Sequence, residues 1–109
     1  MPLPMRDKLQ STECARFLKA LADPERLKIV QCLQTGPKNV SEVAALLDQE
    51  LVNVSHHLGV LRHAGLVQDE RHGKFIVYSL HPDVFRPREG NQAVDALDLG
   101  CCRLELGGK

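Results

Sequence analysis

The amino-acid sequence predicts a mainly α-helical domain completed by one β-hairpin, an α+β arrangement, and three observations support it. Apolar residues recur at helical spacing as far as Ala64. The spacing then changes to that of two short strands. The chain has 109 residues, of which 43% are hydrophobic and 26% are charged. This length and composition are typical of a single globular domain.

Two helices are expected in the first third of the chain. The first is predicted over residues 9–22, because its apolar positions fall at i, i+3, i+4 and i+7: Cys14, Phe17, Leu18 and Leu21. The second begins where Asp23 can cap it and where Pro24 suits the first turn. It ends before Gly36, and its wide apolar arc predicts a central position.

A third, short helix and a fourth, longer helix follow. Asn39 and Glu42 have the spacing of a capping box, which predicts the start of the third helix. The fourth helix is expected from about Leu51 to Ala64, with Gly65 as its C-cap. Its predicted core stripe is Leu51, Val54, Leu58 and Leu61.

The segment LVQDERHGKFIVYSL predicts two short strands joined by a turn at His72-Gly73. An irregular stretch with Pro82 and Pro87 comes next, and a last helix is expected over residues 91–99. Three regions are therefore predicted: an N-terminal extension (1–8), the folded domain (9–99) and a cysteine-containing C-terminal tail (100–109).

Two short helices followed directly by a hairpin is the order typical of a winged helix-turn-helix. A small α+β domain without a nucleic-acid role is the alternative at this point. The outer side of the fourth helix favours the first interpretation, since it combines polar residues with exposed valines. Opposite the core stripe lie Val52, His56, Gly59 and His63, flanked by Asn53, Ser55 and Val60.

These residue types suit a DNA duplex. Asn can read adenine, Ser and His can reach bases or phosphates, and Val can contact a thymine methyl group. Gly59 would allow the helix backbone to approach DNA closely. Net charge is zero, but basic residues gather between Asn53 and Tyr78. The candidate DNA-binding residues are Val52, Asn53, Ser55, His56, Arg62, Arg71, His72 and Lys74.

Other classes of protein have less support. No Ser-His-Asp or Cys-His arrangement and no phosphate-binding glycine loop is recognisable, so we expect no enzyme and no permanently bound cofactor. A winged helix used only for protein interaction is a further alternative. The first ten residues lack the apolar run of a signal peptide, and no stretch has transmembrane length. We therefore expect a cytoplasmic location and no membrane partner.

Four motifs resemble the bacterial ArsR/SmtB family of metal- and thiol-responsive repressors: FLKALADPERLKIVQCL, NVSEVAALL, VSHHLGVLRHAGLV and GKFIVYSL. The resemblance covers roughly residues 10–82. It implies a homodimer in which the first and last helices pack across the two-fold axis. It also implies an operator that is an inverted repeat in double-stranded DNA, with half-sites about one turn apart. Asn53, Ser55 and His56 match groove-facing positions of the family.

The sequence departs from the family pattern in several places. Glu50, Leu51 and Val52 stand where a polar run is usual, so the operator is expected to differ from the family's common ones. The third helix lacks the family's paired cysteines. Only His81 and Asp83 match the zinc site of the last helix, so a nitrogen/oxygen zinc site is not expected.

Thiols remain as sensing groups, and the candidate ligands are Cys101, Cys102 and Cys14. If the termini pack together across the dimer, Cys14 of one subunit would lie near the adjacent pair of either. Three thiolates suit As(III) or Sb(III), with Zn(II) and Cu(I) as second choices for the inducer. Thiol oxidation or persulfide formation is the rival. Family members that sense in this way pair a cysteine of the second helix with one of the last, and Cys32 lies near the first of these positions. Cys14 and Cys32 also have an ordinary alternative as small core residues.

Overall fold

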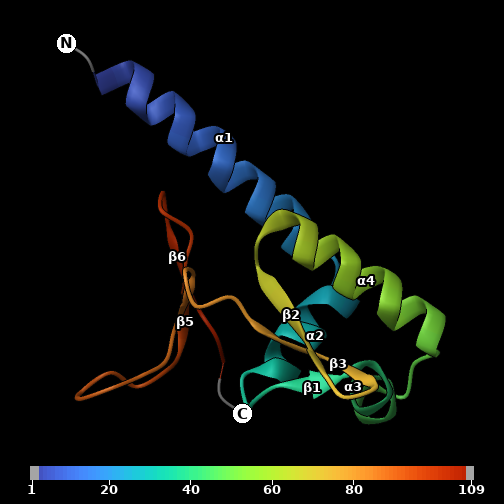
Figure 1. Ribbon diagram of the computed structural model, residues 1–109. Helices are drawn as coiled ribbons and strands as arrows, with labels where there is room; N and C mark the ends of the chain where they lie inside the picture. Colours follow the sequence, from blue (N-terminus) through green and yellow to red (C-terminus); the bar gives the residue numbers. More distant parts are fainter. Residues whose placement is uncertain (1–2, 108–109) are drawn as a thin grey trace.

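The computed structural model describes the backbone of residues 3–107 and the side chains of residues 11–107, which form four helices and two small sheets (Figure 1). The helices are α1 (Leu3–Leu21), α2 (Pro24–Leu33), α3 (Val40–Leu47) and α4 (Leu51–Ala64). The first sheet contains β1 (Lys38–Asn39), β2 (Val67–His72) and β3 (Phe75–Leu80). The second contains β4 (Phe85–Arg86), β5 (Ala96–Asp98) and β6 (Arg103–Glu105).

The starts of α2 and α3 confirm the predicted caps. The Asp23 carboxylate accepts the backbone N–H groups of Glu25 at 2.8 Å and Arg26 at 3.2 Å. These bonds satisfy donors that the first turn of a helix leaves free. Asn39 and Glu42 form the complete capping box, with each side chain accepting the backbone N–H of the other. Local sequence alone therefore fixed where both helices begin.

The fourth helix has the predicted bounds, and its central stripe is buried. Val54, Leu58 and Leu61 lie in the aliphatic core. Gly65 ends the helix with φ +88°, a left-handed conformation that glycine adopts without strain. The prediction that Leu51 is a core residue is wrong, since its side chain is 55% exposed. It is the first residue of α4 and lies about one turn before the buried stripe.

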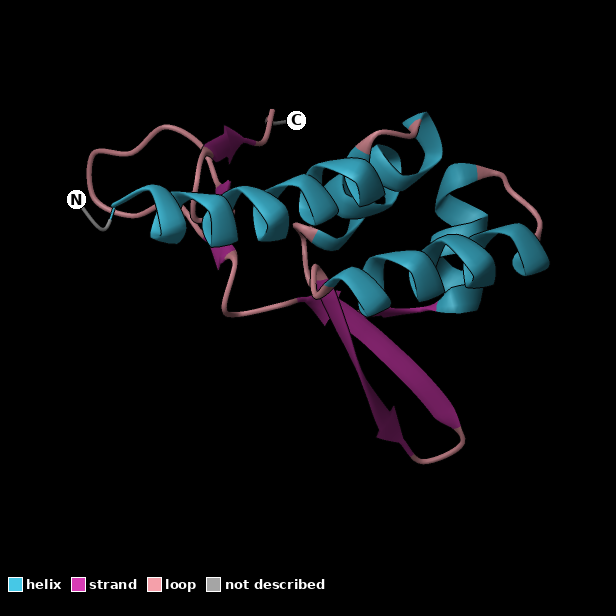
Figure 2. Ribbon diagram, turned by 90° about the horizontal axis from the view of Figure 1, so that it is seen from above, coloured by secondary structure: helices cyan, strands magenta, loops and turns pink. Residues whose placement is uncertain are grey.

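The predicted β-hairpin is present, but its turn is shifted by one residue. β3 pairs with both β1 and β2 in an antiparallel sheet of order β1-β3-β2. His72 pairs with Phe75, so the loop residues are Gly73 and Lys74 and not His72 and Gly73. Gly73 has φ +64°, which a glycine takes more readily than a histidine would. The hairpin projects away from the helices (Figure 2).

The helix predicted over residues 91–99 is wrong. Part of that segment is β5, which pairs with β4 on one side and β6 on the other. A nine-residue helix would have been marginal by itself. As a strand, the segment gains two backbone partners and buries Leu97 and Leu99. The Asp95 carboxylate fixes the chain before β5. It accepts hydrogen bonds from the Arg88 backbone N–H at 2.8 Å and from the Gln34 side-chain amide at 3.0 Å.

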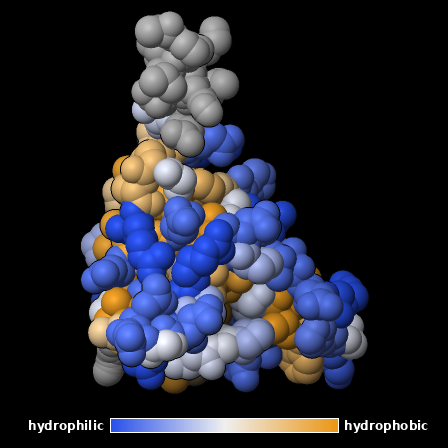
Figure 3. Space-filling view, turned by 90° about the vertical axis from the view of Figure 1, so that its left-hand side faces the viewer, coloured by the Kyte–Doolittle hydropathy of each residue, from blue (hydrophilic) through white to orange (hydrophobic). Residues whose placement is uncertain are grey.

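Within residues 3–107 no helix follows α4, so the last helix that the family resemblance implies for the dimer is not found there. The strands β5 and β6 are drawn beside the main body, and the N-terminal half of α1 extends away from it (Figure 1). The side of the molecule that faces left in Figure 1 carries hydrophobic residues near the N-terminal end and a belt of hydrophilic residues across its middle (Figure 3).

None of the described helices is both long and apolar enough to span a bilayer.

Candidate functional site

The outward side of α4 is not covered by any part of the chain that the structure describes. Val52 is 70% exposed, and Asn53, Ser55 and His56 are also exposed. The buried residues of the same helix lie on its opposite side. The surface on which the nucleic-acid prediction depends is therefore available to a partner. Its polar and apolar mixture fits the edges of base pairs in a major groove.

A shallow hollow continues this surface towards the C-terminal half of α4. We call it the recognition hollow, and it is lined by Ser55, His56, Gly59, Val60 and His63. A Cβ atom added at Gly59 would meet no atom within 4 Å, so the glycine is not required by packing within this chain. The Nδ1 atom of His63 donates to the Gly59 carbonyl oxygen at 3.2 Å.

Arg62 is placed differently from the other candidates on α4. Its Nε atom lies 3.7 Å from an Asp69 carboxylate oxygen on β2, and both side chains are partly exposed. The Asp69 carboxylate therefore offsets part of the positive charge of Arg62. Exposed ion pairs are weak, so Arg62 can still exchange this partner for a phosphate.

The tip of the wing, formed by β2 and β3, carries the remaining candidates. Arg71, His72 and Lys74 are all exposed. Arg71 donates to the Gly73 carbonyl oxygen at 3.2 Å, and the His72 ring lies 3.5 Å from Glu70. Phe75 is also exposed beside them. The wing therefore presents basic groups at the position where the sugar-phosphate backbone of a bound duplex would pass.

The sequence did not reveal a second basic surface, which we call the basic groove. It has a volume of about 360 Å³ and lies between the end of α1 and the C-terminal half of α4. Its lining residues are Arg16, Lys19, Ala20, Arg26, Val60, His63 and Ala64. Arg16 and Lys19 are one helical turn apart, which was a usable signal. Their proximity to α4 depended on tertiary packing.

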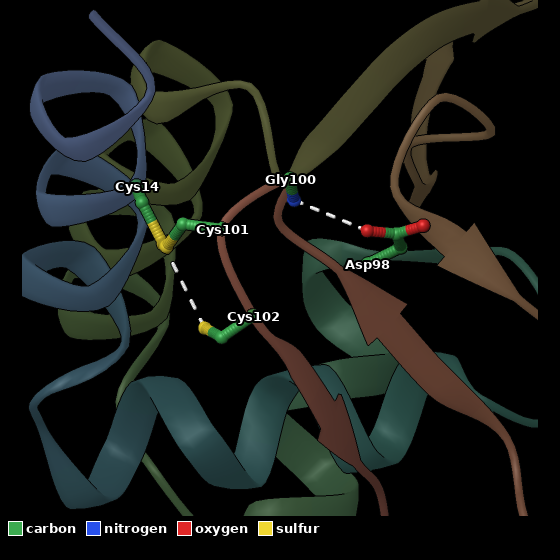
Figure 4. Close-up of a disulfide and its surroundings, with 5 residues drawn as sticks. All are labelled: Cys14, Asp98, Gly100, Cys101 and Cys102. Atoms are coloured by element: carbon green, nitrogen blue, oxygen red, sulfur yellow. Dashed lines mark hydrogen bonds between the residues drawn. A yellow bond between two sulfur atoms is a disulfide. The ribbon is translucent and has the colours of Figure 1, made fainter. Parts of the chain in front are cut away.

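Three of the four cysteines meet at one place (Figure 4). Cys14 is on α1 and is 2% exposed, whereas Cys101 and Cys102 lie between β5 and β6. Cys14 and Cys101 form a disulfide. The Cys102 sulfur is 3.6 Å from that of Cys14, and all three sulfurs lie within 4.8 Å of one another. We call this set the thiol cluster.

The turn between β5 and β6 positions the adjacent cysteines. Gly100 has φ +95°, and its N–H donates to the Asp98 carboxylate at 3.1 Å (Figure 4). The Leu99 N–H donates to the Cys102 carbonyl oxygen at 2.9 Å and closes the turn. Buried Leu99 and Leu106 anchor the segment on either side. The cysteines thus lie in an ordered hairpin within the same chain as Cys14.

Cys32 is separate from the thiol cluster. It is a half-buried free thiol beside Lys28, Thr35 and Leu47. Burial raises the pKa of the Cys32 thiol, which keeps it protonated and weakly nucleophilic at neutral pH. Its environment fits the predicted alternative of a small core residue.

The thiol cluster offers three soft sulfur donors. It has two mutually exclusive states, one reduced and one with a disulfide. Reduced and deprotonated, the three sulfurs can bind one soft ion. With Cys14 and Cys101 oxidised to a disulfide, two of those donors are no longer available. No other group of at least three His, Cys, Asp or Glu side chains in residues 11–107 converges in this way.

The helix pair α3–α4, with α4 exposed on its outer side and β2–β3 beside it, defines a winged helix-turn-helix DNA-binding domain. A family model described as a helix-turn-helix domain matches residues 21–70. The chain belongs to the ArsR/SmtB family of transcriptional repressors.

Several curated relatives support this membership. The transcriptional regulator NmtR of Mycobacterium tuberculosis is 44% identical over 69% of this chain and 62% of its own length. The biofilm growth-associated repressor of Agrobacterium fabrum is 43% identical, covering 76% and 70%. The arsenical resistance operon repressor of Escherichia coli is 39% identical, covering 63% and 60%. The chain thus spans about three fifths of the first and third of these relatives.

Solved structures agree with the fold. A homodimeric winged helix-turn-helix DNA-binding domain from Mycobacterium bovis, described as a possible ArsR-family regulator, has a TM-score of 0.67. It is 31% identical, and the match covers 72% of each chain. The repressor BigR of Xylella fastidiosa has a TM-score of 0.64 and 33% identity, covering 75% of this chain and 79% of its own.

Proposed function

We propose that this protein is a homodimeric repressor that binds operator DNA through α4 and the wing. An inducer acting on the thiol cluster releases it. The observation that carries the inducer part is the convergence of three sulfurs within 4.8 Å. The DNA part is supported by the exposed side of α4 and by family membership.

The proposed DNA complex follows from two-fold symmetry. The Mycobacterium bovis neighbour is a homodimer, and a dimer of this chain would present two copies of α4. Such a dimer would read an inverted repeat whose half-sites are about 34–36 Å apart. Val52, Asn53, Ser55 and His56 would contact base edges. Arg62 and the wing residues Arg71, His72 and Lys74 would contact the backbone.

The proposed inducer is a trivalent metalloid ion such as arsenite or antimonite, with Zn(II) and Cu(I) as second choices. Three thiolates are a soft donor set, and soft ions prefer them to nitrogen or oxygen ligands. Binding requires that the Cys14–Cys101 disulfide first be reduced, which takes two electrons and two protons. The three thiols would then lose their protons as the ion binds.

The proposed coupling runs through α1. Cys14 is one turn before Phe17, and the Phe17 ring lies against Gly65 at the end of α4. Fixing Cys14 to the β5–β6 turn would therefore bias how α1 sits on α4. An ion that binds the DNA-incompetent arrangement more tightly lowers operator affinity by the same coupling free energy, typically about 1–3 kcal/mol.

A second candidate is a thiol-oxidation switch. It is favoured by the Cys14–Cys101 disulfide itself. In this version a two-electron oxidant takes two electrons and two protons from the Cys14 and Cys101 thiols as their S–S bond forms. A peroxide is thereby reduced to water or an alcohol, and a persulfide donor to a thiol and hydrogen sulfide. Oxidation, rather than ion binding, would then change operator affinity.

An operator-release titration separates these candidates. Reduced protein bound to labelled operator is titrated with arsenite, and a second sample is titrated with diamide, a thiol oxidant. We expect arsenite to release the wild type, and a Cys101→Ser, Cys102→Ser variant to stay bound. Cys32→Ser is the matched control and should respond like the wild type, because its thiol lies outside the cluster.

Release of the wild type and the double variant at the same arsenite concentration would refute the metalloid proposal. Release by diamide alone would favour the oxidation switch. A protein that binds no duplex DNA at low salt would favour the interaction-module alternative, since phosphate contacts produce strongly salt-dependent binding.

A further inference from the structure

The basic groove is a charged feature of the described surface that the proposed function does not use. Its basic side chains come from three helices, and none of its lining residues is acidic. They are Arg16, Lys19, Arg26 and His63. The remaining lining residues are Ala20, Val60 and Ala64, which are small enough to leave the groove open. A concave, cationic surface of this kind fits an anionic ligand.

Two of these side chains, Arg16 and Lys19, are exposed in the single chain. Lys19 makes no ion pair or side-chain hydrogen bond within the described part of the chain. Arg16 contacts Glu13 at 3.2 Å, but both side chains are about 60% exposed. Such a pair is weak and exchanges readily. Because the two residues are three apart on α1, they project from the same side of the helix.

Arg26 has a structural role, and its guanidinium lies 4.0 Å from the Asp23 carboxylate, which offsets part of its charge. Its side chain is only 16% exposed. It donates to the Ala20 carbonyl oxygen and, at 3.2 Å, to the His57 ring. These bonds join the end of α1 to α4, so the groove has a fixed shape. Because of this structural role, Arg26 is not substituted in the test of the groove.

The basic groove is continuous with the surface proposed to read DNA. Val60 and His63 line both the basic groove and the recognition hollow. His56 and His63 are seven residues apart, which is about 10 Å along a helix. A duplex seated on the outward side of α4 would thus bring its phosphates towards α1.

We infer that the basic groove binds the sugar-phosphate backbone of the operator, next to the base pairs that α4 reads. This inference rests on the proposed function and extends the DNA contact surface to α1. Arg16 and Lys19 contact phosphate oxygens directly, and His63 adds a ring N–H from α4. Contacts of this kind raise affinity for any duplex and set orientation, without selecting a sequence.

The test measures operator affinity against salt concentration by fluorescence anisotropy. The test variants are Lys19→Gln and the double variant Arg16→Gln, Lys19→Gln. The matched control is Arg86→Gln, Arg88→Gln, which removes the same charge from exposed residues near the loop that joins β4 to β5. Circular dichroism checks that each variant is folded.

We expect the double variant to bind operator and random duplex roughly tenfold more weakly at ~0.1 M salt, with the ratio between the two unchanged. The slope of log affinity against log salt should fall by about two per protomer, and by about one for Lys19→Gln. The control should retain the wild-type slope. An unchanged slope in the double variant, with normal wild-type binding, would overturn this inference and leave the proposed function intact.

Two further outcomes also count against it. If the wild type fails to bind any duplex, the proposed function fails, and this inference fails with it. If inorganic phosphate binds the wild-type protein but not the double variant, and leaves operator affinity unchanged at constant ionic strength, the groove is a small-anion site and not a backbone contact. We expect phosphate and chloride to act alike at equal ionic strength.

Discussion

At the residue scale, a few polar side chains hold segments that the apolar pattern does not fix. Asp95 is the clearest case, since its two carboxylate oxygens accept from the Arg88 N–H and the Gln34 amide. Asp95 thereby joins the β4–β5 loop to the end of α2. The backbone donor of Arg88, and then the Gln34 side chain, hold the pKa of Asp95 below its ordinary value of 3.8.

Asp95→Asn should destabilise the protein by about 1 kcal/mol at pH 7, because it removes a charged acceptor. The folded pKa is lowered, so the carboxylate stabilises the fold fully above pH 3.8. That stabilisation is lost as the pH falls through the lower folded value. Urea unfolding at pH 7 and at successively lower pH should therefore show the gap between variant and wild type narrowing below pH 4.

Glu89→Gln serves as the control for this change, since no side-chain hydrogen bond to Glu89 is found within residues 11–107. It should leave the midpoint at pH 7 unchanged. A gap between Asp95→Asn and the wild type that stays constant down to pH 2 would contradict the proposed role of the carboxylate.

At the element scale, α4 was predictable because its signals are local. The predicted bounds, Leu51 and Ala64, are the observed ones, and Gly65 ends the helix as expected. β5 was not predictable in this way. Its strand conformation depends on pairing with β4 and β6 and on the burial of Leu97, and neither is visible in the segment itself. Residues 91–99 contain no strong local signal against a helix, which is why a helix was predicted there.

Gly59 tests the proposed use of α4. Gly59→Ala should stabilise the helix by about 0.5–1 kcal/mol, because alanine has the higher helix propensity and meets no atom within 4 Å. The same methyl group should weaken operator binding by roughly tenfold if the helix backbone lies close to the groove. Thermal unfolding and anisotropy measure the two effects separately.

A rise in stability with unchanged operator affinity would show that this side of α4 does not approach DNA. The stability measurement acts as the internal control, because it excludes loss of fold as the cause of weaker binding.

At the scale of the whole molecule, the Cys14–Cys101 disulfide joins residues 87 apart in sequence and connects α1 to the β5–β6 hairpin. Closing so long a loop restricts the unfolded chain. Reduction should therefore lower the free energy of unfolding by about 2–4 kcal/mol. Urea unfolding of air-oxidised protein, with and without a phosphine reductant, measures this difference.

Cys32→Ser should keep the full response to the reductant. The double variant Cys101→Ser, Cys102→Ser should lose it, because the Cys102 sulfur also lies within 3.6 Å of that of Cys14. Identical unfolding curves for oxidised and reduced wild type would contradict a stabilising role for the bond.

The sequence by itself determined the helix starts at Asp23 and Asn39, the bounds of α4, the wing and the outward position of Asn53, Ser55 and His56. Each depends on contacts within a few residues or on the period of one helix. Tertiary structure alone decided that Cys14 meets Cys101 and Cys102 within one chain, that Arg16 and Lys19 lie beside His63, and that β5 is a strand. Those outcomes depend on free energies of packing between distant segments, which no local pattern encodes.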